Sequence, residues 1–259
     1  MQSPTLGFIG TGKITSAVAE GFSTCANPPA RIIVSPRNEQ KAKRLADKFS
    51  IVNIAESNQD VVNQSDWIFL ALRPETVEEA LTPLKFRSQQ RIISMIPTKP
   101  VAVISKLVHP AERISRAVPL PSVAKGEGPI LFFSKDDQAR MLLSQVGELF
   151  NVPEESQFHT LWAMTGMVSP VFALMDMFHQ WAESKGVGSN LSRNYTAAFF
   201  EILARMAMHH PETTFSDLAH DAATPGGLNE QAVQFIHEKG GYDLFEQALT
   251  AVKARFLDP

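Results

Sequence analysis

Cysteine is nearly absent from this chain of 259 residues, since Cys25 is the only one. A single thiol can form neither an internal disulfide nor a cysteine-based zinc site, so the sequence predicts a reducing compartment and a cytoplasmic location. The histidines are scattered and show no H-E-x-x-H spacing. We therefore expect no metal site.

An excess of positive charge is also lacking. Lysine and arginine number 24 against 27 aspartates and glutamates, which gives a formal net charge of -3. Such a chain is poorly suited to neutralise a phosphate backbone, so we expect no nucleic-acid partner. No run of about 18 apolar residues is present, which predicts no membrane span. The first residues lack the basic segment and the cleavage site of a secretory signal.

Apolar runs and helical segments alternate through the first part of the chain. Short apolar runs predict strands at 6–9, 31–34, 67–72, 91–96, 113–118 and 130–133. Helical spacing predicts helices at 14–22, 39–49 and 74–81. Strands that alternate with helices are typical of βαβ units, so this part is predicted to be an α/β domain with a mostly parallel sheet.

From about Ser156 the strand signals stop. Helices are predicted at 158–185, 191–210, 215–221, 229–238 and 242–256. The composition shift near Pro153 predicts a boundary between a domain at 1–155 and an all-helical domain at 156–259. The helical domain carries too many apolar residues for one narrow stripe, which predicts burial on more than one side. We interpret it as a dimerisation domain of a homodimer or larger homo-oligomer; an ordinary helical core is the alternative.

The sharpest local motif is a glycine-rich turn, G-F-I-G-T-G-K-I-T, between the first predicted strand and helix. Gly10 permits a tight turn, and Gly12 permits close approach of a pyrophosphate to the backbone and to the helix start. Thr15 departs from the glycine or alanine usual at the third fingerprint position. The context nevertheless predicts a Rossmann-like dinucleotide-binding domain at 1–155, with coenzyme contacts from Gly10, Thr11, Gly12, Lys13 and Ile14.

The end of the second strand indicates which dinucleotide is bound. NAD sites usually place an acidic residue there, but this chain reads Val34-Ser35-Pro36-Arg37-Asn38. Ser35 and Arg37 can instead hold a 2′-phosphate. The sequence therefore favours NADP over NAD.

Several motifs, in order along nearly the whole chain, resemble those of the pyrroline-5-carboxylate reductase family. The opening G-F-I-G-T-G-K-I is similar to its G-F-I-G-x-G-N-M, and the apolar strand leading into Ala71, Leu72, Arg73 and Pro74 is similar to its strand ending in V-K-P. The segment 116–119, R-A-V-P, resembles its R-x-M-P, and the turn T-P-G-G at 224–227 resembles its S-P-G-G. The resemblance implies coenzyme contacts at 71–74 and a ribose contact from Asn58.

That family reduces a cyclic imine by hydride transfer from NAD(P)H, at a site built where two subunits meet. The resemblance implies reduction of 1-pyrroline-5-carboxylate to proline. A carboxylate substrate is suited to backbone amides at a glycine turn before a helix. We therefore expect it to contact Thr224, Pro225, Gly226, Gly227, Leu228 and Asn229. A turn that only caps a helix is the alternative.

Two departures from the family pattern leave the proton donor open. Leu228 stands where the family has a threonine near the imine nitrogen, and Leu120 stands where it has an asparagine. Asn229 is then one candidate donor. Asp176 and His179 share a helix face and form another. These changes also leave three alternatives: reduction of another imine, reaction with a keto or hydroxy acid, or a dinucleotide-binding regulator without activity.

Overall fold

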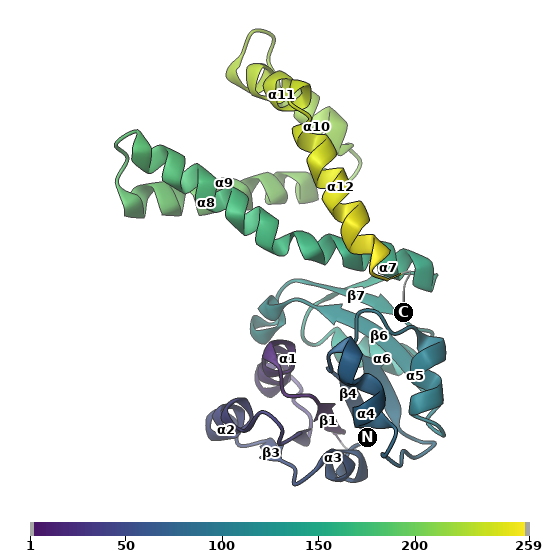
Figure 1. Ribbon diagram of the computed structural model, residues 1–259. Helices are drawn as coiled ribbons and strands as arrows, with labels where there is room; N and C mark the ends of the chain where they lie inside the picture. Colours follow the sequence, from purple (N-terminus) through teal and green to yellow (C-terminus); the bar gives the residue numbers. More distant parts are fainter. Residues whose placement is uncertain (1–2, 257–259) are drawn as a thin grey trace. The chain divides into compact units, whose positions relative to one another are not determined.

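The computed structural model describes residues 3–256, which form two compact units (Figure 1). The first unit runs to Trp162 and also includes Arg255 and Phe256, and the second is Ala163–Ala254. The first unit thus extends beyond the boundary at residue 155 that the composition suggested, because Phe158 and Trp162 are buried in its core.

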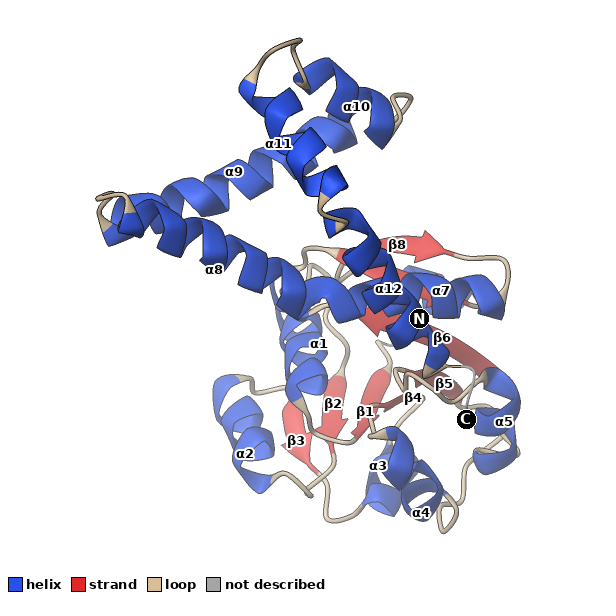
Figure 2. Ribbon diagram, turned by 45° about the horizontal axis from the view of Figure 1, so that its top comes forward, coloured by secondary structure: helices blue, strands red, loops and turns tan. Residues whose placement is uncertain are grey.

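An eight-stranded sheet, drawn in red in Figure 2, forms the centre of the first unit. Its strands are β1 Thr5–Ile9, β2 Arg31–Val34, β3 Val52–Ile54, β4 Trp67–Leu70, β5 Arg91–Ser94, β6 Arg113–Pro119, β7 Pro129–Phe133 and β8 Glu148–Asn151. They lie in the order β3-β2-β1-β4-β5-β6-β7-β8, and only the β6–β7 pair is antiparallel. The predicted mostly parallel α/β sheet is confirmed. Its order reverses at β1, the switch point at which open α/β sheets bind ligands.

Helices cover both faces of this sheet. They are α1 Lys13–Thr24, α2 Glu39–Lys48, α3 Asn58–Gln64, α4 Val77–Leu81, α5 Val101–Leu107 and α6 Asp137–Leu143, with the 3₁₀ turns η1 Pro74–Thr76 and η2 Pro121–Lys125. α1, α2, η2 and α6 contribute to one hydrophobic cluster, and α3, α4 and α5 contribute to the other. Strands β1, β2, β4 and β5 therefore carry buried apolar side chains on both faces, which explains the continuous apolar runs of the sequence.

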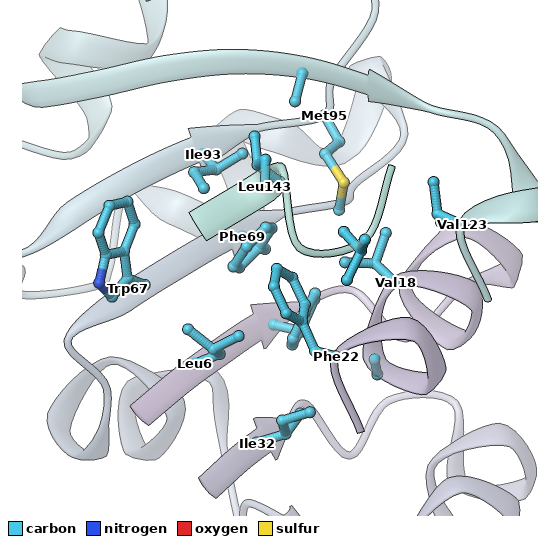
Figure 3. Packing of buried hydrophobic residues seen from close by; sticks show 14 of the residues in the cluster. Leu6, Val18, Phe22, Ile32, Trp67, Phe69, Ile93, Met95, Val123 and Leu143 are labelled. Atoms are coloured by element: carbon cyan, nitrogen blue, oxygen red, sulfur yellow. The ribbon is translucent and has the colours of Figure 1, made fainter. Parts of the chain in front are cut away.

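Aromatic packing joins α1 to the strands at the centre of the first unit. Figure 3 shows Phe22 of α1 beside Phe69 of β4, with Leu6 and Ile32 on the adjacent strands. Phe8 and Phe69 stack with ring centroids 4.6 Å apart, and Phe22 meets Phe69 edge-on at 5.9 Å. Such pairs add to the free energy of burial and hold the C-terminal half of α1 against β4.

The second unit consists of helices. α7 Glu155–Met164 begins in the first unit, and η3 Thr165–Met167, α8 Val168–Ser184, α9 Ser189–His209, α10 Phe215–Ala222, α11 Leu228–Glu238 and α12 Gly241–Ala254 follow. α8 and α9 pack side by side through Phe178, Phe199 and Phe200. The predicted all-helical domain is confirmed, except that the 3₁₀ turn η3 separates α7 from α8 within the single helix predicted at 158–185.

Large apolar side chains of the second unit are exposed. They include Phe172, Trp181, Tyr195, Met206, Met208, Phe215 and Leu228. The segment Glu155–Ser184 is long and apolar enough to span a membrane, by length and composition alone. This segment was not expected from the sequence, because its apolar residues do not form an unbroken run. An exposed apolar surface of this extent marks a site of interaction.

Candidate functional site

Gly10 shapes the phosphate loop at the end of β1. Its φ is +96°, in the left-handed region that favours glycine, and a Cβ on this residue would collide with the carbonyl oxygen of Ala71. The Ala71 amide in turn donates to the carbonyl of Ile9 at 2.9 Å. Two predicted coenzyme segments, the glycine loop and the residues after β4, are thus brought together.

Thr15, in the first turn of α1, stabilises the same loop through a hydrogen bond. Its side chain is buried, and its hydroxyl donates to the carbonyl of Gly10 at 2.5 Å. The departure from the usual glycine or alanine therefore has a structural reason, because the hydroxyl satisfies a carbonyl in the loop.

Ser35 does not have the role predicted for it. Its side chain is buried, and its oxygen accepts from the Gly10 amide at 3.0 Å. Thr11 is also buried, and its hydroxyl donates to the Ser35 carbonyl at 2.7 Å. The predicted contact of Ser35 with a 2′-phosphate is corrected. The side chain is buried, and its hydrogen bond with the Gly10 amide positions the phosphate loop instead.

The start of α1 is open to a ligand. Gly12 is the N-cap of α1, and a Cβ there would meet no atom within 4 Å. No side chain caps this helix and its first turn carries no acidic residue. The uncapped amides and the positive end of the helix dipole fit a pyrophosphate, and Lys13 and Ile14 are the first residues of this turn.

A cavity of about 600 Å³ lies beside the residues that follow β2. Arg37, from that loop, and Asn58, the first residue of α3, both line it. No acidic residue stands at the end of β2. The two residues expected at the ribose and its 2′-phosphate are therefore brought together, although α2 and β3 separate them in the sequence.

Leu72, Arg73 and Pro74 follow β4 at the same edge of the sheet. Pro74 begins η1, so the helix predicted at 74–81 starts as a 3₁₀ turn and becomes α-helical at Val77. A Cβ on Gly10 would lie 3.3 Å from the Leu72 side chain, which places Leu72 against the phosphate loop. Arg73 is exposed at this edge.

Asp176 and His179 in α8 do not pair with each other. The Asp176 carboxylate accepts from Gln180 at 2.7 Å, whereas His179 Nδ1 lies 2.7 Å from the Ser192 hydroxyl of α9. His179 Nε2 faces Glu183 at 3.4 Å. The predicted carboxylate–imidazole pair is corrected: the two residues share a helix face, but each finds a different partner.

The turn before α11 uses two of its own amides. The Gly226 amide donates to the Glu230 carboxylate at 2.7 Å, and the Gly227 amide donates to the Thr224 carbonyl at 2.8 Å. The expectation that the amides of Gly226 and Gly227 are free for a carboxylate is therefore corrected. Pro225 stands between Thr224 and the left-handed Gly226, whose φ is +71°. The free donors of this turn are instead the first amides of α11.

Asn229 and Leu228 open α11. The Asn229 side-chain amide donates to the Ala222 carbonyl at 2.8 Å, which ties the turn to the end of α10. Leu228 is 85% exposed. The backbone amides of these two residues lie in the first helical turn, where no intrahelical acceptor exists.

Comparison with known proteins matches the two parts of the chain to different families. The family described as NADP oxidoreductase coenzyme F420-dependent matches residues 5–97, and the family described as pyrroline-5-carboxylate reductase dimerisation matches residues 155–257. The pyrroline-5-carboxylate reductase of Pseudomonas aeruginosa is 27% identical over 98% of this chain and 96% of its own length. This chain is thus similar over its whole length to pyrroline-5-carboxylate reductases, and residues 155–257 match their dimerisation domain.

Solved structures of the pyrroline-5-carboxylate reductase family share the fold. The enzyme of Coxiella burnetii superposes with a TM-score of 0.82 at 24% identity, over 100% of this chain and 98% of its own. The enzyme of Plasmodium falciparum, solved with NADP bound, superposes with a TM-score of 0.86 at 18% identity, over 99% of each chain. The second unit lies within the residues that match the pyrroline-5-carboxylate reductase dimerisation family, as the resemblance predicted.

A buried arginine was not given a role by the sequence analysis. Arg116, the first residue of the R-A-V-P segment, is fully buried in the middle of β6. Its guanidinium donates to Glu155 at 2.8 Å and to the carbonyl of Pro97 at 2.7 Å, and lies 2.5 Å from His159 Nε2. The ring of Phe158 lies under it, 4.7 Å away. The sequence signal was a lone arginine within an apolar strand, but two of its partners, Glu155 and His159, lie in a helix distant in sequence.

Charge and burial act in opposite directions in this cluster. Burial lowers the pKa of Arg116, while the hydrogen bond and the charge of Glu155 raise it. Burial also lowers the pKa of His159; the Arg116 charge lowers it further and Glu155 opposes both. His159 is thus kept neutral beside a guanidinium. Among residues 3–256, no group of three potential metal ligands occurs.

Proposed function

We propose that this protein reduces 1-pyrroline-5-carboxylate to proline with NADPH. The observation that carries the proposal is a glycine loop open to a pyrophosphate in a chain whose whole length is similar to pyrroline-5-carboxylate reductases. When bound, NADPH supplies the hydride that forms the new C–H bond of the reduced imine. One proton from solvent or from a side chain completes the amine.

The first unit holds the coenzyme in this proposal. The Thr11 and Gly12 amides and the start of α1 receive the pyrophosphate, because no protein atom lies within 4 Å of where a Cβ on Gly12 would be. Arg37 and Asn58 receive the ribose and its 2′-phosphate in their shared cavity. Arg37 gives a charge-assisted hydrogen bond that a coenzyme without this phosphate cannot accept.

The second unit holds the substrate carboxylate. We assign it to the first amides of α11, those of Leu228 and Asn229, since the glycine amides of the turn already have acceptors. Asn229 retains one side-chain N–H beyond its bond to Ala222, and we propose it as the donor that orients the imine nitrogen. Leu228 itself presents only an apolar side chain.

The second unit also joins a second copy of the chain. Its match to a dimerisation domain and its exposed aromatic side chains support a homodimer or a larger homo-oligomer. A cytoplasmic location is part of the proposal, since a chain with one cysteine requires no oxidising compartment.

The direct test measures NADPH oxidation by the purified protein with 1-pyrroline-5-carboxylate, beside a 1-piperideine carboxylate and an α-keto acid. We expect turnover of the pyrroline to exceed that of both comparison substrates. Tight NADPH binding without pyrroline turnover would overturn the assignment.

Arg37→Ala tests the coenzyme assignment separately. Loss of a charge-assisted hydrogen bond costs about 1.5–3 kcal/mol, so we expect kcat/KM for NADPH to fall at least about tenfold. The value for NADH is expected to stay within about twofold, since that coenzyme has no 2′-phosphate. An equal loss for both coenzymes would contradict the role of Arg37.

A further inference from the structure

The turn between β5 and α5, residues 96–100, is held by side chains from outside it. Two of its carbonyls, those of Ile96 and Pro97, accept hydrogen bonds from Arg116 Nη2 at 3.1 and 2.7 Å. Arg116 comes from β6, the strand beside β5. The start of the turn is therefore attached to a fully buried guanidinium.

Glu155 of α7 attaches the other end of the turn. One carboxylate oxygen, Oε1, accepts from the Val101 amide at 2.8 Å and from Arg116 Nη1 at 2.8 Å. Val101 is the first residue of α5, whose N-cap, Pro100, supplies no side-chain hydrogen bond. Glu155 thus takes the place of a capping side chain for α5. Through Arg116, the same oxygen also joins the two ends of the turn.

This network costs more than stability alone requires. Replacing a buried ion pair by apolar residues of similar volume is often neutral or stabilising. The Nε of Arg116 is buried and has no hydrogen-bond partner among residues 3–256, which adds a desolvation cost. Exceptions of this kind are expected where one exact conformation serves a function.

Thr98, in the middle of the held turn, has an unused hydroxyl. Its side chain is half-buried, and within residues 3–256 its hydroxyl has no hydrogen-bond partner. Just before the turn, the Met95 amide donates to the carbonyl of Leu70, the last residue of β4, at 2.9 Å. Thr98 therefore follows β5 at the same edge of the sheet as the loops after β1 and β4.

The coenzyme assigned under the proposed function leaves one of its halves without a partner. The pyrophosphate lies at the start of α1, and the adenosine half lies at Arg37 and Asn58, on the β2 side of β1. A dinucleotide spans the switch point of such a sheet. The nicotinamide half then extends to the other side of β1, over the ends of β4 and β5.

We propose that Arg116 and Glu155 are positioning residues, which hold the turn 96–100 so that the Thr98 hydroxyl bonds the nicotinamide half of the coenzyme. The identity of this ligand rests on the proposed function. A threonine hydroxyl both donates and accepts, which suits the carboxamide group of nicotinamide. A turn without these contacts would have to be ordered on binding, at a cost in affinity.

The test measures dissociation constants by calorimetry for two probes, NADPH and adenosine 2′,5′-bisphosphate, which lacks the nicotinamide half. Thr98→Val replaces the hydroxyl by a methyl group. Arg116→Lys keeps the charge but loses the planar fork that reaches two carbonyls and Glu155 at once. We expect each variant to weaken NADPH at least about threefold, within the range of one lost hydrogen bond, and to keep the bisphosphate within about twofold.

Two controls make the same exchanges elsewhere. Thr82→Val changes an exposed threonine at the end of α4, and Arg113→Lys changes an exposed arginine at the start of β6. Both controls should bind both probes as the wild type does. Circular dichroism verifies folding. If Arg116→Lys does not fold, Glu155→Gln takes its place, because it removes the charge and keeps an acceptor oxygen.

A double variant, Thr98→Val with Arg116→Lys, tests whether Arg116 acts through Thr98. The two side chains form no hydrogen bond with each other, so independent effects would multiply. We expect the double variant to bind NADPH within about twofold of Arg116→Lys alone, because a hydroxyl on an unheld turn has no fixed place to lose.

Three outcomes would overturn the inference: normal NADPH binding by Thr98→Val, an equal loss of both probes, or multiplied losses in the double variant. The binding measurements use no pyrroline. The inference can therefore fail in a protein that reduces 1-pyrroline-5-carboxylate, and it can hold in one that does not. A wild type that does not bind NADPH would overturn both the inference and the proposed function.

Discussion

Gly10 and Gly12 serve the phosphate loop for different reasons, although the sequence motif treats them alike. Gly10 is required by its own backbone, since it has a positive φ and lies against the carbonyl of Ala71. Gly12 has an ordinary φ of -96° and open space where a Cβ would lie. The first glycine therefore serves the fold, and the second serves the ligand.

Gly10→Ala is expected to destabilise the protein. The alanine would be strained at this φ and would press on a backbone atom that cannot move away, so we expect a loss of more than about 1 kcal/mol in the free energy of unfolding. Urea unfolding at neutral pH measures this loss. An unchanged midpoint would mean that the loop adapts to a side chain.

Gly12→Ala is expected to leave the unfolding free energy within about 0.5 kcal/mol, because the new methyl group meets no protein atom. NADPH affinity is expected to fall at least about tenfold, since the methyl group occupies the space assigned to the pyrophosphate. Coenzyme fluorescence titration measures the affinity. Normal NADPH binding would contradict the assigned position of the phosphates.

Single-residue roles were only partly predictable from the sequence. The glycine loop and Arg37 were singled out in the sequence by a motif and by their place at the end of a strand, and their contacts with the coenzyme stay predictions. Ser35 was misassigned because sequence does not tell whether a hydroxyl at a strand end turns into the fold. His179 was misassigned because helical spacing identifies neighbours on its own helix, whereas its closest partner, Ser192, comes from α9.

At the scale of elements, the strands buried on both faces were predictable and the marginal ones were not. β3 has three residues, of which only Val52 is buried, and β8 is an edge strand with largely exposed side chains. The seven-residue α3 has only two buried residues, Val61 and Val62. Such elements are held by their neighbours in the sheet rather than by their own hydrophobic pattern.

Helix α7 depends on the buried charge of Arg116. Glu155→Ala would leave this guanidinium without its counter-ion, and we expect a loss of about 3 kcal/mol in the free energy of unfolding. This is the lower end of the range for a broken buried pair, because Glu155 is 25% exposed. The neighbouring Glu154→Ala serves as the control, with an expected loss within about 0.5 kcal/mol. Equal unfolding midpoints would contradict a stabilising role for the pair.

The same cluster predicts a pH dependence. The pKa of His159 is lowered in the folded protein, so the unfolded chain binds a proton more readily. The stability that the neutral ring contributes is therefore present above the usual pKa of about 6.5 and is lost as the pH falls below it. Unfolding midpoints at pH 7.5, 6.5 and 5.5 should decrease for the wild type and decrease less for His159→Gln. If the midpoints of the wild type and of His159→Gln decrease equally with falling pH, His159 is not a source of the pH dependence.

At the scale of the whole molecule, the exposed apolar surface of the second unit requires a partner. We expect Phe172→Glu to lower the assembly mass to that of a single chain, 28.6 kDa, because a charge in an apolar interface has no counter-ion. Met141→Glu, at an equally exposed residue of the first unit, should keep the wild-type mass. Sedimentation analysis measures the assembly mass of both variants. An unchanged mass for Phe172→Glu would exclude this face of the second unit as the interface.

Phe256 lies in the first unit although it follows the whole second unit in the sequence, and this determines which contacts form last during synthesis. Its ring stacks on His159 at 5.5 Å and lies 5.9 Å from Trp162, so it completes an aromatic cluster begun by α7. The ribosome adds Phe256 only after every helix of the second unit has been translated. The sheet can therefore form while the chain is still growing, but this cluster closes last, and a nascent chain stalled before Arg255 would leave His159 and Trp162 uncovered to chaperones.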